Sequence, residues 1–206
     1  PLLGRQVFSW PGLEWLLLAA ALTLPLSGVL TYGKPQALTF TDVCAMAAAG
    51  FAIPWAFSGL YGLRTLDNGY LLVLTPLVAA FCSDSLALFT GMACGKHKLA
   101  PLVSPHKTVE GALGGLVGGM AGMAIFCLVY RAITGVNLGL PLCVALGLLG
   151  ALLGELGDLS FSAVKRQYGI KDYGRLLPGH GGVLDRFDSV LFAAPVLCAL
   201  LRALAA

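Results

Sequence analysis

The sequence has 206 residues, of which 58% are hydrophobic and only 11% are charged, with a formal net charge of +3. Soluble domains carry about 25% charged residues, so this composition excludes an ordinary soluble globule. It also excludes a disordered chain and a nucleic-acid-binding protein, because those classes need high polarity or dense positive charge. We therefore expect an all-α, polytopic integral membrane protein, with the lipid bilayer as a partner and no nucleic acid.

A helix that crosses a bilayer core about 30 Å thick needs about 20 apolar residues. Six windows of this kind lie between charged or Gly/Pro-rich breaks, and they predict about six transmembrane helices in a single transmembrane domain, residues 1–206. Because the chain begins at Pro1, we also expect it to be part of a longer gene product with earlier spans. The six windows are Leu13–Leu30, Val43–Leu60, Tyr70–Ala93, Val109–Tyr130, Leu138–Leu159 and Val183–Leu204.

Basic residues are distributed unevenly between the two sides of this topology. One set of connecting segments holds eight lysines and arginines, and the opposite set holds four. Loops rich in Lys and Arg stay in the cytoplasm. The bias therefore places the segments around Lys107 and Lys171 on the cytoplasmic side.

Glycine recurs at three- and four-residue spacing in the fourth window, from Gly111 to Gly122. Small residues at this spacing let helix backbones approach closely, so tight packing is the simplest explanation. A ligand role is the alternative. A helix of this kind is also compatible with a homodimer.

Acidic residues interrupt three of the predicted spans. An ionisable group near the bilayer centre costs about 2.5 to 3.5 kcal/mol, so it needs a partner, an ion or water. Each acid alone is explained by a buried ion pair or by a helix end. Two pairs are spaced three residues apart, however, so each pair shares a helix face and can point into a common cleft. The acids are Asp84 in the third span, Glu155 and Asp158 in the fifth, and Asp185 and Asp188 in the sixth.

A basic segment, Gly95–Gly111, precedes the fourth span. Ser104 or Thr108 can cap that helix, while Lys107 and exposed backbone N–H groups face an anion. Capping alone would also explain the hydroxyl residues.

A second polar segment, Ser162–Asp188, is interpreted as a loop leading into the sixth span. Its Pro178–Gly182 run lets the backbone come close to a ligand, and His180 either hydrogen-bonds a phosphate or anchors the loop. Carboxylates beside basic groups are what a hydrated Mg²⁺ and a polyphosphate require, so a metal–phosphate site is our hypothesis. The basic residues at the start of the segment are Lys165, Arg166 and Lys171.

The segment from Ser162 to Asp188 resembles the signature of the phosphatidate cytidylyltransferases, also called CDP-diacylglycerol synthases. That signature, S-x-x-K-R-x4-K-D-x-G-x3-P-G-H-G-G-x2-D-R-x-D, is met without a gap. The resemblance covers the chain from about Phe81 onward. The other family elements in order are an acid at Asp84, S-P-x-K-T-x-E-G at Ser104–Gly111 and G-D at Gly157–Asp158.

The resemblance implies a nucleotidyltransferase of phospholipid biosynthesis that transfers CMP from CTP to phosphatidate, giving CDP-diacylglycerol and pyrophosphate. It implies Mg²⁺ as cofactor and leaves open a second, monovalent or divalent, cation. We expect the site to face the cytoplasm from a bacterial inner (plasma) membrane. On this interpretation residues 1–68 hold spans of generic character and residues 69–206 form the catalytic membrane core.

The resemblance also assigns roles to individual side chains. Asp158 and Asp185 are expected to hold the metal, with Asp188 and Asp84 completing or supporting its ligands. The residues expected to neutralise substrate and product phosphates are Lys107, Lys165, Arg166, Lys171 and Arg186. Those expected to bind substrate through hydrogen bonds or close backbone approach are Ser104, Thr108, His180, Gly181 and Gly182.

Three other functions remain open from the residues alone. An ion-coupled transporter would also use intramembrane acids and glycine-rich helices. A related CTP-dependent enzyme could act on another phospholipid acceptor, because generic Leu, Val and Ala surfaces do not identify lipid tails. A non-catalytic membrane scaffold is the third alternative.

Overall fold

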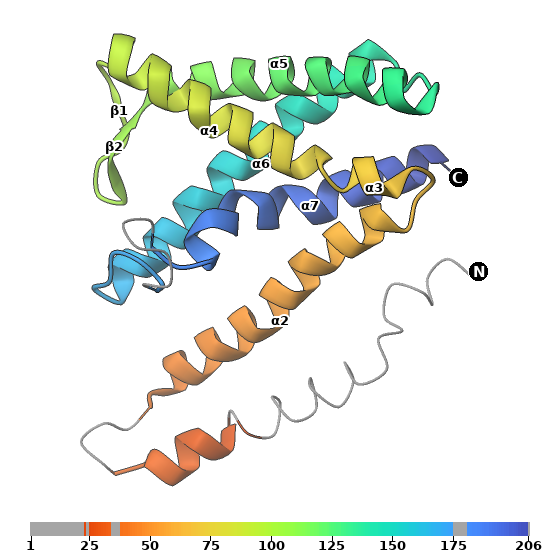
Figure 1. Ribbon diagram of the computed structural model, residues 1–206. Helices are drawn as coiled ribbons and strands as arrows, with labels where there is room; N and C mark the ends of the chain where they lie inside the picture. Colours follow the sequence, from red (N-terminus) through yellow and green to blue (C-terminus); the bar gives the residue numbers. More distant parts are fainter. Residues whose placement is uncertain (1–22, 24, 34–37, 175–180, 206) are drawn as a thin grey trace. The chain divides into compact units, whose positions relative to one another are not determined.

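The computed structural model describes residues 23, 25–33, 38–174 and 181–205 (Figure 1). Five helical segments in these ranges are long and apolar enough to cross a membrane. The expectation of an all-α polytopic membrane protein is therefore confirmed. Five of the six predicted spans have a helix in the structure, whereas the first, Leu13–Leu30, lies largely outside the described residues. The five segments are Phe40–Arg64, Gly69–Cys94, Val109–Thr134, Leu140–Gln167 and Leu184–Leu204.

The chain divides into two compact units, Pro1–Ser58 and Gly59–Ala206. Helix α2, Phe40–Arg64, begins in the first unit. Its start is fixed by reciprocal hydrogen bonds: the Thr39 N–H and hydroxyl donate to Asp42 Oδ2 at 3.0 and 2.7 Å, and the Asp42 N–H donates to Thr39 Oγ1 at 3.2 Å. Such a capping pair satisfies N–H groups that the first helical turn leaves without partners.

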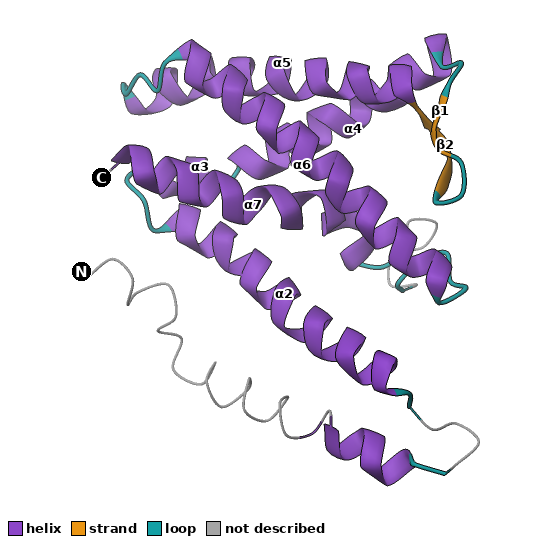
Figure 2. Ribbon diagram, turned by 180° about the vertical axis from the view of Figure 1, so that it is seen from behind, coloured by secondary structure: helices purple, strands orange, loops and turns teal. Residues whose placement is uncertain are grey.

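The second unit is a bundle in which sequence neighbours pack together. α4 lies against α5, α5 against α6, and α6 against α7, while α4 also contacts α6 and α7 (Figures 1 and 2). Its buried core includes Leu63, Met123 and Leu197. The helices of this unit are α3 (Gly69–Leu72), α4 (Thr75–Cys94), α5 (Val109–Thr134), α6 (Leu140–Gln167) and α7 (Leu184–Ala205).

A β-hairpin connects α4 to α5. The sequence analysis did not predict this hairpin. Strands β1 (Lys98–Ala100) and β2 (Ser104–Thr108) are antiparallel, with Lys98 opposite Thr108 and Ala100 opposite Ser104. Thr108 then caps α5, because its hydroxyl oxygen accepts the Gly111 N–H at 3.1 Å. Of the two capping candidates, Thr108 has this role, and Ser104 belongs to the hairpin.

Helix α6 continues to Gln167, eight residues beyond its predicted end at Leu159. The interpretation of Ser162–Gln167 as a loop was therefore wrong. No helix-breaking residue occurs there, and the helix ends only before Gly169, whose φ of +65° requires glycine-like freedom. The extension places Lys165 on a helix with its side chain nearly buried.

The glycines of α5 serve close helix packing within the chain, as the simplest explanation proposed. A Cβ added at Gly119 would lie 2.7 Å from both the Gly147 carbonyl oxygen and the Ala151 Cβ on α6, and one at Gly115 would lie 2.9 Å from Ser83 Oγ on α4. Because these glycines already pack against α4 and α6, they do not by themselves support a homodimer, which stays a prediction.

Substituting Gly147 with Ala is expected to destabilise the bundle by about 1 to 3 kcal/mol, the usual cost of overpacking. Its new Cβ would collide with the Gly119 carbonyl and lie 2.9 Å from Met120 Cα. Gly154→Ala on the same helix is the matched control, because its Cβ would meet its nearest atom, Ser189 Cβ, at an ordinary 3.4 Å. Thermal unfolding midpoints in one detergent compare the two variants, and equal midpoints would contradict the packing argument.

Candidate active site

A cavity of about 490 Å³ lies where α4, the hairpin, α5 and α6 meet. Charged residues from three of these elements line it: Asp84 from α4, Lys107 from β2, and Glu155 and Asp158 from α6. The structure therefore brings Lys107 together with acids from two helices. The most distant of these acids, Asp84 and Asp158, are 74 positions apart in the sequence. This cavity combines an acid from the third predicted span with the acids of the fifth.

Lys107 is the centre of this charged group. Its Nζ lies 2.8 Å from Glu155 Oε1 and 2.6 Å from Asp158 Oδ2, with 22% of the side chain exposed. The two acids reach it together because residues three apart share a helix face. Burial disfavours the charged ammonium, but Asp158 and Glu155 outweigh burial and raise the pKa of Lys107 above its ordinary value. Lys107 is therefore a permanent cation at neutral pH.

Negative charge exceeds positive charge around this lysine. Asp84 lies within electrostatic range of Glu155, Asp158 and Asp188, as well as of Lys107. Three carboxylates, those of Glu155, Asp158 and Asp84, thus lie near one ammonium in a largely apolar setting. Such an excess favours an additional cation, since clustered like charges repel strongly where the dielectric constant is low.

The carboxylates fit a magnesium ion by the chemistry of their oxygen atoms. Mg²⁺ prefers hard oxygen ligands and usually binds through one or two carboxylates, several waters and substrate phosphates. Within the described ranges, no three His, Cys, Asp or Glu side chains are grouped closely enough to enclose a metal by themselves. An ion that takes most of its ligands from water and substrate does not need such a group.

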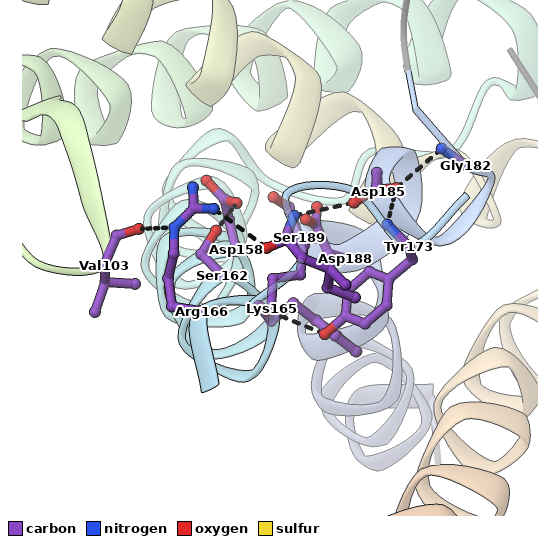
Figure 3. Close-up of polar contacts among 12 residues, drawn as sticks. Val103, Asp158, Ser162, Lys165, Arg166, Tyr173, Gly182, Asp185, Asp188 and Ser189 are labelled. Carbon is purple, nitrogen blue, oxygen red and sulfur yellow. Dashed lines mark hydrogen bonds and ion pairs between the residues drawn. The ribbon is translucent and has the colours of Figure 1, made fainter. Parts of the chain in front are cut away.

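A second charged cluster is formed by Lys165 and Asp185, which are drawn in Figure 3. Lys165 Nζ donates to Asp185 Oδ1 at 3.0 Å, and only 10% and 5% of the two side chains are exposed. The Asp185 Oδ2 atom accepts backbone N–H groups of Gly182 and Tyr173, both at 2.9 Å. The carboxylate therefore joins the end of α6, the glycine-rich segment and the start of α7.

The two clusters are electrostatically connected through Asp188. Its carboxylate lies within range of Asp158, Lys165 and Asp185, and its side chain is buried. Asp158 also accepts a hydrogen bond from the Ser162 hydroxyl at 3.3 Å. All four predicted metal-binding acids thus belong to one connected region, although neither Asp185 nor Asp188 is part of the cavity lining. The oxygen atoms of Asp185 are used by protein donors.

The remaining predicted residues differ in their surroundings. Arg166 donates through Nε to the Val103 carbonyl at 3.2 Å, which links the end of α6 to the hairpin. Gly181 and Gly182 lie close to the Asp185 carboxylate, and Gly181 has a φ of +80°. Lys171 is exposed. Arg186 is also exposed and has at least one interaction partner within the protein. His180 lies outside the described residues.

Tyr173 is a site residue that sequence reasoning missed. Its hydroxyl donates to the Phe161 carbonyl at 3.0 Å, its ring packs edge-on against Phe161, and Lys165 Nζ lies 5.4 Å from the ring centroid. Burial, with the neighbouring Asp185 and Asp188 charges, raises the pKa of Tyr173, so the phenol stays protonated and can donate. Nothing in the local spacing signals this role, because the contacts depend on the fold of the loop.

Tyr173→Phe is expected to remove one hydrogen bond worth about 1 kcal/mol and to lower the unfolding free energy by that amount. Tyr173→Ala should cost more, because it also removes the aromatic contact and the ring beside Lys165. Denaturant unfolding in detergent measures both effects. Tyr70→Phe, which changes a half-exposed tyrosine, is the control. A Tyr173→Ala variant as stable as Tyr173→Phe would show that the ring contacts contribute nothing.

Comparison with known proteins identifies the family of the chain. A family model described as the cytidylyltransferase family matches residues 3–204. The chain belongs to the cytidylyltransferase family. The match begins well before Phe81, so the family likeness includes the first two predicted spans as well as the signature region.

Bacterial relatives within this family carry the name phosphatidate cytidylyltransferase. The chain is 40% identical to one from Staphylococcus saprophyticus over 158 residues, which are 77% of this chain and 58% of the relative. It is 42% identical to one from Bacillus subtilis over 166 residues, covering 79% of this chain and 60% of the relative. The chain thus spans about three fifths of the length of these cytidylyltransferases.

Proposed function

We propose that this chain contains the catalytic membrane core of a phosphatidate cytidylyltransferase, which transfers CMP from CTP to phosphatidate. The observation that carries the proposal is the cavity in which Lys107 meets Glu155 and Asp158 beside Asp84. Such a site suits the joining of two phosphate-bearing substrates. The relatives, which align with most of this chain, are named for transfer of a cytidylyl group to phosphatidate, and CTP is the donor that we propose.

The proposed reaction is a direct displacement at phosphorus. An oxygen of the phosphatidate phosphate attacks the α-phosphorus of CTP, and a new P–O bond forms. The bond from the α-phosphorus to the bridging oxygen breaks, and its electron pair leaves with pyrophosphate. A phosphate monoester has a second pKa of about 6, so the acceptor is largely a dianion at neutral pH and needs no strong general base. Catalysis then depends on positioning and on neutralising charge.

The side chains of the site fit these tasks. Lys107 supplies a fixed positive charge to a phosphate in the cavity. Lys165, held by Asp185 and Tyr173, adds a second cation that cannot move freely. Mg²⁺, when bound, would neutralise phosphate oxygens, and Asp158 with Asp84, which line the cavity, would hold it. Asp188 would support these acids, and Asp185 would hold Lys165 in place. Arg166, Lys171 and Arg186 remain proposed phosphate contacts at the same end of the bundle.

We also propose that this end of the bundle faces the cytoplasm of a bacterial cell from the inner membrane. The hairpin and the C-terminal end of α6 carry basic residues, and loops rich in Lys and Arg are usually cytoplasmic, which supports this orientation. CTP is a cytoplasmic solute, so this orientation supplies the nucleotide directly to the cavity.

The deciding experiment incubates the purified protein with labelled CTP, Mg²⁺ and phosphatidate in mixed micelles. Label is expected to appear in a CDP-lipid together with one equivalent of pyrophosphate, and EDTA should stop both products. Omission of phosphatidate is the matched control. If an intact, folded protein produces no CDP-lipid under these conditions, the proposed function is wrong.

A further inference from the structure

The cavity at the charged site has a second, apolar end whose role the reaction does not explain. Its walls there consist of side chains and backbone from the last turns of α4 and the first turn of α5. No charged side chain from this part of either helix contributes to the apolar lining. The residues are Ala87, Leu88, Gly91 and Met92 from α4, and Gly111 and Ala112 from α5.

Two of these lining residues are also largely exposed. Leu88 is 60% exposed and Met92 is 67% exposed, although α4 belongs to a membrane-spanning segment. Large apolar side chains exposed on a span contact lipid acyl chains. The cavity lining therefore combines exposed apolar side chains of a membrane-spanning segment with Lys107 and the acids.

The side chains of Leu88 and Met92 also limit the width of the apolar part of the cavity, where α4 meets α5. The backbones of α4 and α5 approach so closely that a Cβ on Gly111 would lie 2.9 Å from the Ala87 carbonyl oxygen, and one on Gly91 would lie 3.1 Å from Thr108 Oγ1. A Cβ on Gly111 would therefore collide with backbone, and one on Gly91 would crowd Thr108. Leu88 and Met92 are the two large, flexible side chains among the six lining residues, so substitutions there change the remaining space most.

The depth of these residues matches the upper part of one lipid leaflet. Leu88 and Met92 lie six and two residues before Cys94, the end of α4, which is roughly 9 and 3 Å at 1.5 Å per residue. Lys107 immediately precedes the cap of α5. A phosphate at Lys107 would therefore place a glycerol backbone and the first acyl methylenes beside Leu88 and Met92.

We infer that Leu88 and Met92 form the acceptor-specific wall of the site, contacting the glycerol backbone and first acyl methylenes of phosphatidate. This inference rests on the proposed function. CTP has no hydrocarbon part that would gain from a wall facing the bilayer, whereas an amphiphile with a phosphate headgroup satisfies both ends of the cavity at once. The wall gives the enzyme a means of selecting a lipid phosphate over a soluble one.

The test separates the two substrates kinetically. Leu88→Trp and Met92→Trp are expected to narrow the apolar end and to raise the KM for long-chain phosphatidate by roughly tenfold or more, the usual effect of misfit in an apolar pocket. The KM for CTP should stay within about twofold of its original value. Phe89→Trp is the matched control: Phe89 is 62% exposed on the same helix, and it is not among the described residues that line the cavity.

The possible outcomes distinguish failure of this inference from failure of the proposed function. An unchanged KM for phosphatidate, or a raised KM for CTP alone, would overturn the inference while leaving cytidylyl transfer intact. If the unsubstituted protein makes no CDP-lipid, the proposed function itself fails. Should the Trp variants not fold, Leu88→Ala and Met92→Ala replace them. These are expected to raise the KM for phosphatidate through lost contact, and an unchanged value would again overturn the inference.

Discussion

Asp158→Asn is expected to lower kcat/KM for CDP-lipid formation by roughly a thousandfold, in the range found when one preorganised electrostatic contact is removed from an active site. Asp158 pairs with Lys107 at 2.6 Å and lines the cavity together with Asp84. Asparagine keeps the shape and still accepts the Ser162 hydroxyl, so the fold should survive. The loss therefore reports charge rather than packing.

The measurement is initial-rate kinetics with labelled CTP over a range of Mg²⁺ concentrations. Asp67→Asn, which changes an exposed acid in the turn before α3, is the control and should retain full activity. A requirement for more Mg²⁺ in Asp158→Asn would assign this acid to metal binding. Cytidylyl transfer at the original rate by a folded Asp158→Asn variant would refute its role.

Lys165→Met is expected to destabilise the protein by about 3 to 5 kcal/mol, because it leaves the Asp185 carboxylate buried without its cation. Only 5% of the Asp185 side chain is exposed, and the two backbone N–H donors from Gly182 and Tyr173 carry no compensating full charge. Equilibrium unfolding in detergent should show this loss directly. Lys171→Met, at an exposed lysine, should change stability by less than about 0.5 kcal/mol.

The double variant Lys165→Met/Asp185→Asn distinguishes a structural charge pair from a catalytic one. Removing both charges should recover most of the lost stability, since no uncompensated ion remains. Activity should not return, because the proposed phosphate-binding cation is still missing. Recovery of both stability and activity would show that the pair serves folding alone, and failure to recover stability would contradict the assignment of the pair.

The membrane-spanning helices that the structure describes, and the types of residue in the site, could be predicted from the sequence. Long apolar windows must form helices in a bilayer, and acids at three-residue spacing must share a face, so the alignment of Glu155 with Asp158 followed from local rules. The Ser162–Asp188 signature indicated the family. These features depend on neighbours a few residues apart or on a contiguous motif.

The pairing of side chains from distant helices could not be predicted in this way. The contact between Lys107 and Glu155 spans 48 positions and depends on the hairpin that precedes α5. The burial of Lys165 depends on α6 extending past its apolar window, which the Asp185 carboxylate makes tolerable. Tyr173 was missed for the same reason, since its partners Phe161 and Asp185 lie 12 positions away on either side.

The ion pairs of Lys107 also have a consequence for the assembly of the protein in its membrane. Acids on a hydrophobic helix oppose its transfer from the translocation machinery into lipid. Lys107 precedes Glu155 and Asp158 in the chain, so it is synthesised first and stands at the start of α5 when α6 emerges. The acids of α6 can thus meet a protein counterion from the hairpin that precedes α5, before any metal or nucleotide binds.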